Sequence, residues 1–323
     1  MDLDDRTLRR LKLSDLRLFH AVAQWGGMAK AAAHLNISQP AVSKAIRALE
    51  HTLGVPLLER HPQGVEATVY GKALLSGGVA VFDELKQSVK HIEFLADPTA
   101  GELRIGCSEP LAAGFVPTAI DGFSKQYPRV GFQVVTGDPV TLVERELRQR
   151  NIELAIAPVQ GLNLGADVEI EVLFDDRQVV MAGTQNKWAR RRNIRLADLV
   201  HEPWLLPPPD SIIGRAIAET FRANGVELPR GSVVSFSIPL VHHLVGGGRF
   251  LVMLPVSMAR LGRELPLKIL DVRSASISRP TGIMTLKKRT LSPLAQLFIK
   301  RMRDVATVSA KGQMGSLPRR RRG

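Results

Sequence analysis

Apolar residues near the start of the chain recur at the spacing of short amphipathic helices. Residues 14–24 carry them three or four positions apart, which predicts a helix, and an Ala-rich helix follows over residues 28–35. Ser38 is a favourable N-cap and Pro40 suits a first helical turn, so another helix is predicted to begin there. Asn36 tolerates the left-handed conformation that a sharp turn between two helices requires. The pattern predicts two helices that cross at a tight turn, preceded by a third.

The two crossing helices are predicted to share a buried seam, and small Ala32 lets them approach closely. The seam residues are expected to be Ala31, Leu35, Ile37, Val42 and Ala45. The outer face of the second helix then exposes side chains that can contact base edges or phosphates in a major groove. They are Gln39, Ser43, Lys44 and Arg47. An ordinary helical hairpin is the alternative to a helix-turn-helix that binds DNA.

The segment that follows favours DNA binding. Residues 57–70 predict two short strands that turn near Pro62-Gln63-Gly64, as in the wing of a winged helix-turn-helix. Arg60 and His61 would lie near phosphates on this wing. Thr68 is placed to cap the next helix.

Residues 13–60, LSDLRLFHAVAQWGGMAKAAAHLNISQPAVSKAIRALEHTLGVPLLER, resemble the DNA-binding domain of the LysR-type transcriptional regulators. The order of the later segments and the chain length also match that family. The resemblance implies a sequence-specific regulator that binds promoter DNA as a homodimer or homotetramer and responds to a small-molecule effector. Gln39, Pro40, Ser43 and Arg47 would then lie at base edges. Phosphate contacts would come from Ser38, Lys44, Arg60 and His61.

A long helix is predicted over residues 70–95, with Gly77-Gly78 weakening its middle. Its apolar stripe has no neighbouring domain to cover it, so the pattern favours a partner helix. In the LysR family this linker helix makes the antiparallel contact between two DNA-binding domains. Residues 97–101, Asp-Pro-Thr-Ala-Gly, end the helix and form a hinge.

Strands alternate with helices from Glu102 onward, which predicts an α/β fold with a mostly parallel sheet. A second lobe is expected from about Phe174, with two strands, 267–271 and 281–286, returning to the first lobe. Two lobes joined in this way resemble a periplasmic-binding-protein-like effector domain. The predicted domains are a winged helix-turn-helix over 1–70, a linker helix and hinge over 71–100, the effector domain over 101–310 and a basic disordered tail over 311–323.

Ligands of open α/β sheets bind beyond the carboxyl ends of the strands. This rule selects four loops of the first and second lobes, and the end of a further strand at Ser235, as the effector site. Their candidate residues are Ser108, Glu109, Thr136, Gly137, Asp138, Pro158, Ser211, Ile212 and Ser235. Ser and Thr before a helix are usually plain N-caps, which is the alternative for each hydroxyl. Four segments of this domain resemble the branch that includes the galactose-binding-protein regulator, which implies a sugar or a related small metabolite.

The net charge of +13 does not by itself indicate DNA binding, because residues 300–323 contribute eight Lys or Arg and one acid. A solvated tail and an additional non-specific attraction to DNA are both open for this segment. The single cysteine, Cys107, excludes an internal disulfide and suits a cytoplasmic protein. No apolar run is long enough to span a membrane.

Catalytic and cofactor motifs are absent from the sequence. Gly246-Gly247-Gly248 lacks phosphate-loop spacing, and His242-His243 has no third ligand at metal spacing. We therefore expect no enzyme activity, no cofactor and no metal. A small-molecule-binding protein whose N-terminal helices only mediate assembly remains the second hypothesis, and an enzyme the third.

Overall fold

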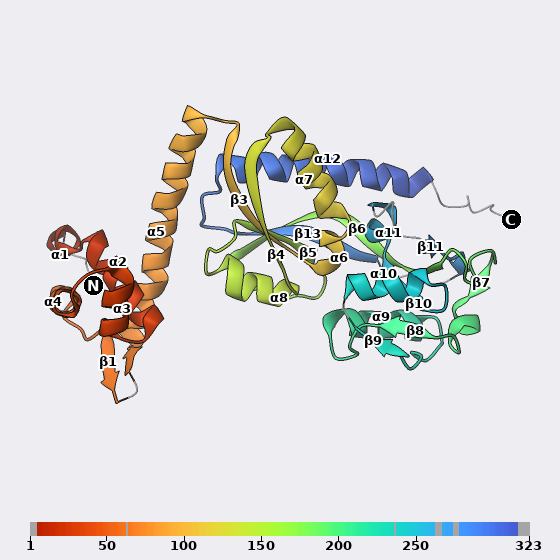
Figure 1. Ribbon diagram of the computed structural model, residues 1–323, viewed down its shortest axis with the longest axis horizontal. Coiled ribbons are helices and arrows are strands. Elements are labelled where there is room, and N and C mark those ends of the chain that lie inside the picture. Colours follow the sequence, from red (N-terminus) through yellow and green to blue (C-terminus); the bar gives the residue numbers. More distant parts are fainter. Residues whose placement is uncertain (1–4, 63, 236, 262–266, 274–277, 316–323) are drawn as a thin grey trace. The chain divides into compact units, whose positions relative to one another are not determined.

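The computed structural model describes residues 5–62, 64–235, 237–261, 267–273 and 278–315. The chain divides into two compact units, residues 1–88 and 89–323, and the long helix α5 belongs to both (Figure 1). The first unit contains the predicted winged helix-turn-helix. Its elements are α1 (Asp5–Arg10), α2 (Leu13–Trp25), α3 (Met28–Leu35), α4 (Gln39–Leu53), β1 (Leu58–His61), β2 (Gly64–Ala67) and α5 (Val69–Ala96).

The core of the first unit lies between α2, α3 and α4. Ala31, Ala32 and Val42 are buried in it, as the sequence predicts. Ile37 is 40% exposed and Ala45 is half-buried, so these two expected seam residues were wrong. The seam of α4 consists instead of Val42, Ile46 and Leu49, because positions i, i+4 and i+7 share one face of a helix.

The tight turn between α3 and α4 has the predicted geometry. Asn36 adopts a left-handed conformation with φ of 54°, and its N–H bonds the carbonyl oxygens of Ala32 and Ala33. Ser38 is the N-cap of α4, and its hydroxyl accepts a hydrogen bond from the N–H of Ala41 at 3.4 Å. The angle between α3 and α4 is therefore set by local backbone chemistry in addition to apolar packing.

The wing is tied to the helices by side chains that accept backbone hydrogen bonds. Glu50 Oε1 on α4 accepts from the N–H groups of Leu57 and Leu58, at 2.9 and 3.3 Å. Thr68 Oγ1 accepts from the N–H of Gly71 at 3.0 Å and donates to the carbonyl of Pro56 at 2.8 Å. Thr68 thus caps α5, as predicted, and also fixes the chain that enters the wing.

The second unit is built on one mixed sheet with the strand order β4-β3-β5-β13-β6-β10-β8-β9, and β11 also pairs with β6. The elements of the first lobe are β3 (Ala100–Cys107), α6 (Glu109–Ala112), α7 (Phe115–Gln126), β4 (Arg129–Thr136), α8 (Pro139–Thr141), η1 (Leu142–Leu147), β5 (Leu154–Pro158), β13 (Ser278–Leu286) and α12 (Pro293–Gly315). Those of the second lobe are β7 (Ile194–Arg195), η2 (Leu196–Leu199), β8 (Trp204–Leu206), α9 (Ile212–Ala223), β9 (Val233–Val234), α10 (Ile238–Gly246), β10 (Leu251–Pro255), α11 (Val256–Leu261), β11 (Leu267–Ile269) and β12 (Val272–Arg273).

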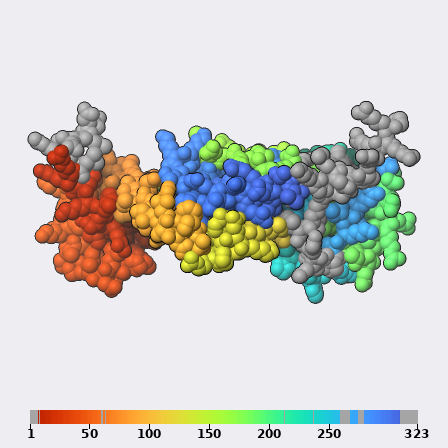
Figure 2. Space-filling view, turned by 90° about the horizontal axis from the view of Figure 1, so that it is seen from above, coloured from red at the N-terminus to blue at the C-terminus, as the bar shows by residue number. Residues whose placement is uncertain are grey.

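Helices cover both faces of each lobe. In the first lobe α7 and α12 bury one face around Phe115, Phe123 and Phe298, and α12 lies alongside α7 in both views (Figures 1 and 2). The other face is covered by η1, which is a π-helical turn. In the second lobe α9 lies on one face, and α10 and α11 on the other.

Strand β6 (Val168–Gly183) joins the two lobes. Its first half pairs with β13 in the first lobe, and its second half pairs with β10 and β11 in the second. The prediction that residues 281–286 return to the first lobe is confirmed. The same prediction for residues 267–271 was wrong, because Lys268 pairs with Ala182 in the second lobe. The expected start of the second lobe near Phe174 falls inside β6.

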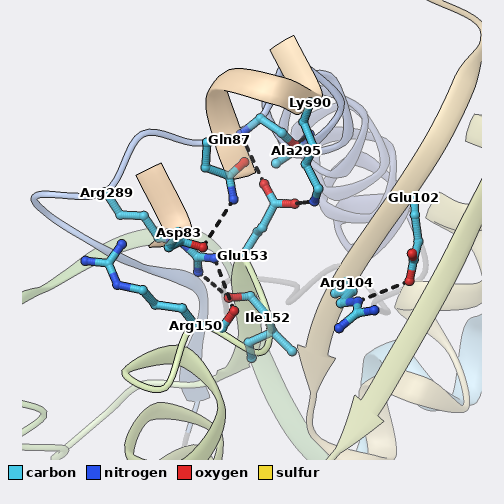
Figure 3. Close-up of polar contacts among 11 residues, drawn as sticks. Asp83, Gln87, Lys90, Glu102, Arg104, Arg150, Ile152, Glu153, Arg289 and Ala295 are labelled. Carbon is cyan, nitrogen blue, oxygen red and sulfur yellow. Dashed lines mark hydrogen bonds and ion pairs between the residues drawn. The ribbon is translucent and has the colours of Figure 1, made fainter. Parts of the chain in front are cut away.

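The last turns of α5 are fastened to the first lobe by a buried carboxylate (Figure 3). Glu153 is 2% exposed; it accepts from Lys90 Nζ at 2.5 Å and from the N–H of Ser292 at 3.0 Å. Beside it, the buried guanidinium of Arg289 donates to the carbonyl oxygens of Ile152 and Arg150. Elements far apart in sequence, α5, β5 and the start of α12, are thereby held together.

Two further segments bear on the predicted organisation. α5 runs without a break through Gly77-Gly78, and several of its apolar side chains are exposed in this chain. They are Val81, Leu85, Val89, Ile92 and Leu95.

At the other end of the chain, α12 continues to Gly315, so the tail boundary expected at 311 falls inside a helix. Residues 316–323 lie outside the described residues.

Gly71→Ala should destabilise the first unit. A Cβ at Gly71 would lie 2.2 Å from the carbonyl oxygen of Leu57, so α5 or the entry to the wing would have to move. We expect a loss of about 1–3 kcal/mol in the free energy of unfolding, measured by chemical denaturation. Gly77→Ala in the same helix is the control, since no heavy atom lies within 4 Å of its Cβ. A Gly71→Ala chain as stable as Gly77→Ala would contradict this packing.

Removing the carboxylate of Glu153 should cost more stability than removing an exposed one. Glu153→Ala leaves the ammonium of Lys90, which is only 19% exposed, without its counter-ion, so we expect a loss on the order of 3 kcal/mol. Glu102→Ala breaks the exposed Glu102–Arg104 pair in the same view and should cost less than about 1 kcal/mol (Figure 3). Equal thermal shifts for the two variants would count against the buried anchor.

Candidate DNA-binding surface and effector site

Helix α4 presents a polar and basic outer face. Five of the predicted DNA-contacting residues are exposed on or beside its first turns: Ser38, Gln39, Pro40, Lys44 and Arg47. Arg47 Nε donates to the carbonyl of Ser43 at 3.2 Å. The face therefore combines an amide, an ammonium and a guanidinium, the donor groups that bind base edges and phosphates.

Ser43 differs from its neighbours on α4. It is half-buried, and its hydroxyl donates to the sulfur of Met28 at 3.0 Å, so it contacts α3. Thioether sulfur is a weak acceptor, and the hydroxyl can rotate to a better one. Ser43 therefore contributes to the packing of α4 against α3.

On the wing, His61 lies beside an acid. Its side chain is 48% exposed, and Nε2 is 3.7 Å from the carboxylate of Glu59, an ion pair only when the imidazole is protonated. Residues i and i+2 share one face of a strand, a signal for this pair that the sequence contained. The side chain of Arg60 lies outside those that the structure describes. Exposed Lys30 on α3 is a further cation of this unit that the sequence analysis did not select.

The predicted effector residues of the first lobe lie at the carboxyl ends of their strands. Ser108 follows β3, is 6% exposed and makes no side-chain cap bond, and its N–H donates to the carbonyl of Ile156 on β5. Half-buried Pro158 ends β5 next to it, whereas Glu109 is exposed. Thr136 ends the edge strand β4 and is exposed. Ser108 therefore lies between the other two strand ends, because β3 pairs with β5 on one side and with β4 on the other, where Thr136 pairs with Cys107.

Asp138 serves as the N-cap of α8, just after half-buried Gly137. Its Oδ1 accepts from the N–H groups of Val140 and Thr141, both at 3.0 Å. Burial raises the pKa of this carboxyl, but hydrogen bonds from Thr141 and the backbone outweigh burial and hold the pKa below its ordinary value. The structure therefore gives Asp138 a local role as an N-cap.

The hydroxyl groups of the second lobe are also engaged. Ser211 Oγ accepts from the N–H of Gly214 at 2.9 Å and donates to the carbonyl of Pro208 at 2.6 Å. Ser235 Oγ accepts from the N–H of Ser237 at 3.0 Å. Both therefore have local structural roles, and the side chain of Ile212 lies outside those that the structure describes.

The sequence analysis missed a polar group where the lobes join. Asp176 on β6 is 4% exposed, and its two oxygens accept from the N–H and the hydroxyl of Ser257, at 3.1 and 2.5 Å. Ser257 is in α11, so this pair joins the crossing strand to the second lobe. Burial raises the pKa of Asp176, and the two hydrogen bonds from Ser257 act in the opposite direction.

A cysteine and a pair of histidines were also considered from the sequence. Cys107 is fully buried, and burial raises the pKa of its thiol to about 12, so it is a poor nucleophile. His242 and His243 are exposed on α10. Among the described residues there is no group of three potential metal ligands and no helix long and apolar enough to cross a membrane.

Comparison with known proteins matches both units. The family model for the LysR substrate binding domain matches residues 96–307, and the model for the bacterial regulatory helix-turn-helix protein of the lysR family matches residues 13–72. The regulator PcaQ of Agrobacterium fabrum is 29% identical over 92% of this chain and 96% of its own length. GbpR of Azospirillum brasilense is 28% identical over 91% of this chain and 86% of its own. Because the two sequence identities are nearly equal, they do not distinguish one branch of the family from another. The expected resemblance to the branch of the galactose-binding-protein regulator is therefore not confirmed.

A solved structure has the same fold over most of this chain. Full-length CbnR in complex with its target DNA superposes with a TM-score of 0.61 at 23% identity, covering 91% of this chain and all of that one. The arrangement of a helix-turn-helix unit, a long helix and a two-lobed unit is therefore found in a known DNA-bound regulator.

The stability of the second unit should depend on pH through Asp176. Because the folded-state pKa is raised, this carboxyl contributes stability that is full below its unfolded pKa, near 3.8, and is lost as pH rises through the folded value. Asp176→Asn keeps an acceptor for Ser257 and should remove that part of the pH slope. Thermal unfolding from pH 4 to 8 measures it, and identical slopes for the two chains would refute the raised pKa.

Proposed function

Because the chain belongs to the LysR family of bacterial regulatory helix-turn-helix proteins, we propose that its α4 binds promoter DNA under the control of an effector in the two-lobed unit. The chain is a LysR-type transcriptional regulator with a helix-turn-helix DNA-binding domain and a substrate-binding domain. The exposed polar face of α4 is the observation that carries the residue-level proposal.

At the DNA, the first turns of α4 enter the major groove. Gln39, Pro40 and Arg47 face base edges, where a guanidinium can form two hydrogen bonds to guanine and an amide two to adenine. Ser43 reaches a base edge once its hydroxyl leaves the weak bond to Met28. Ser38, Lys44, Arg60 and His61 bind phosphates, which fix the register without reading sequence.

A second copy of the chain completes the DNA-binding assembly. The exposed apolar side chains of α5 are the surface that a partner α5 would cover, as in the linker helices of the family. A homodimer or homotetramer formed in this way would bind two half-sites of a partly palindromic promoter. Since its partner is promoter DNA, we place the protein in the cytoplasm.

The effector would bind where Ser108 and Pro158 meet the crossing strands. There it would contact both lobes, and different contacts in two lobe arrangements would shift the equilibrium between them. The buried anchor at Glu153 fixes the end of α5 to the first lobe, so a change between the lobes can reach the linker helix. This is a coupling between two sites of one regulator.

Arg47→Ala should weaken binding of the intact chain to its promoter fragment about fivefold or more, because one bidentate base contact contributes about 1–3 kcal/mol. Its thermal unfolding should stay near that of the parent chain, since Arg47 is exposed. His51→Ala, an exposed change at the other end of α4, is the matched control and should bind normally. Mobility shifts with promoter and scrambled duplexes provide the measurement. Unchanged promoter affinity in Arg47→Ala would remove the basis for the proposed contacts.

A further inference from the structure

Within the described part of the chain, two buried polar atoms on β13 have no hydrogen-bond partner. Thr281 is fully buried, and its Oγ1 has no partner among the described residues. Arg279 lies two positions away, and its buried Nε also has none within the described part of the chain. Because alternate residues of a strand share a face, Arg279 and Thr281 point to the same side of the sheet. Buried polar groups are nearly always paired, so each is a candidate for a missing ligand or water.

Nearby carboxylates do not neutralise Arg279. Its direct cross-strand neighbour is Asp176, but both oxygens of that carboxylate are bonded to Ser257. Glu219 is exposed on α9, and its charge acts on Arg279 without any hydrogen bond between the two among the described residues. Burial lowers the pKa of Arg279, and Glu219 acts in the opposite direction; the guanidinium nevertheless remains charged at neutral pH. A half-buried cation without a partner is costly, and an anion would relieve that cost.

The position of these two residues matches the effector site. Thr281 pairs with Pro158 of β5 on one side and with Phe174 of β6 on the other. Pro158 is one of the effector residues predicted from the strand ends, and Ser108 is bonded to β5 two residues before it. Arg279 lies two residues from Thr281 toward the second lobe and pairs with Asp176 of β6. Gln178, two residues further along β6, pairs with Pro255 of β10. β13 therefore carries a cation and a free hydroxyl between the ends of the parallel strands of both lobes.

We propose that the effector of this regulator is a small acidic metabolite whose anionic oxygens are bound by Arg279 and Thr281. The planar guanidinium can donate two parallel hydrogen bonds to a carboxylate or phosphate, and the hydroxyl of Thr281 can donate a third. A neutral sugar, the class implied by the resemblance to one branch of the family, would leave the charge of Arg279 unbalanced. This inference rests on the proposed function, because it assigns the chemistry of the same effector site.

The test uses the full-length chain and a panel of defined compounds. The panel contains aliphatic dicarboxylates, aromatic carboxylates, a hexose phosphate and neutral hexoses, each titrated by calorimetry after a thermal-shift screen. We expect at least one acid to bind and every neutral hexose to fail. Carboxylates and the hexose phosphate form separate arms, which distinguish the two kinds of anionic group.

Two variants then locate the binding. Arg279→Ala should weaken binding of the acid at least tenfold, and Thr281→Val, which keeps the shape but removes the hydroxyl, should weaken it severalfold. Arg177→Ala is the matched control, since Arg177 is exposed and neighbours Asp176 on the opposite face of β6. If Arg279→Ala does not fold, the loss with Thr281→Val and the panel result still test the proposal.

The outcomes separate this inference from the proposed function. If no acid binds, if neutral hexoses bind in their place, or if both variants retain full affinity, the acidic effector is excluded even when promoter binding is intact. Loss of promoter recognition by the parent chain would instead refute the proposed function. Effector binding by the two variants is measured without DNA, so a defect there cannot arise from α4.

Discussion

The antiparallel pairing of β6 with β13 is the constraint on which the second unit depends. Strand β6 contributes its first half to one lobe and its second half to the other, so the two lobes share a single backbone. The register of the β6–β13 pair shifts between Thr281 and Gly282. A Cβ added to Gly282 would lie 2.7 Å from the carbonyl oxygen of Glu171. Only glycine fits so close an approach, and the resulting bulge lies at the point where the lobes meet. A ligand that contacts Thr281 therefore acts on the strands that connect the lobes.

The first unit depends on a comparable set of backbone contacts. Glu50 binds the chain that enters the wing, and Thr68 binds the chain that leaves it together with the start of α5. These hydrogen bonds connect α4, the wing and the start of the linker helix. In the second unit Glu153 has the corresponding role for the far end of α5. Each end of the linker helix is thus fixed to its own unit, which suits a helix that transmits changes between effector and DNA.

The parts predicted well from sequence are those set by local chemistry. Asn36 and Ser38 define their turn through their own backbone and side-chain bonds, and the strand ends at Ser108 and Pro158 follow from alternating apolar runs. The predictions that were wrong depend on contacts between segments that are far apart in the sequence. Residues 267–271 read as a returning strand, but pairing partners are chosen by the whole sheet. Ile37 fits the apolar pattern and is nevertheless exposed, because the seam follows Ile46 and Leu49. Arg279 was not selected from sequence because β13 begins at Ser278, three residues before the predicted strand 281–286. Asp176 was not selected because β6 crosses the expected lobe boundary near Phe174.

Hydrogen-bond satisfaction separates structural hydroxyls from candidate ligand-binding ones in a way that sequence position cannot. Ser211 precedes a helix and resembles a binding residue, but it both donates and accepts within its own turn, so an effector would have to break a cap to use it. Thr281 has no such signature in the sequence, yet its buried hydroxyl is unpaired. Leaving a buried donor unsatisfied costs about 1–3 kcal/mol, whereas binding an anion there recovers that cost. Binding at Thr281 would pair a buried hydroxyl, whereas binding at Ser211 would break a helix cap. This difference in free energy favours the crossing strands over the helix caps as the place where the effector is recognised.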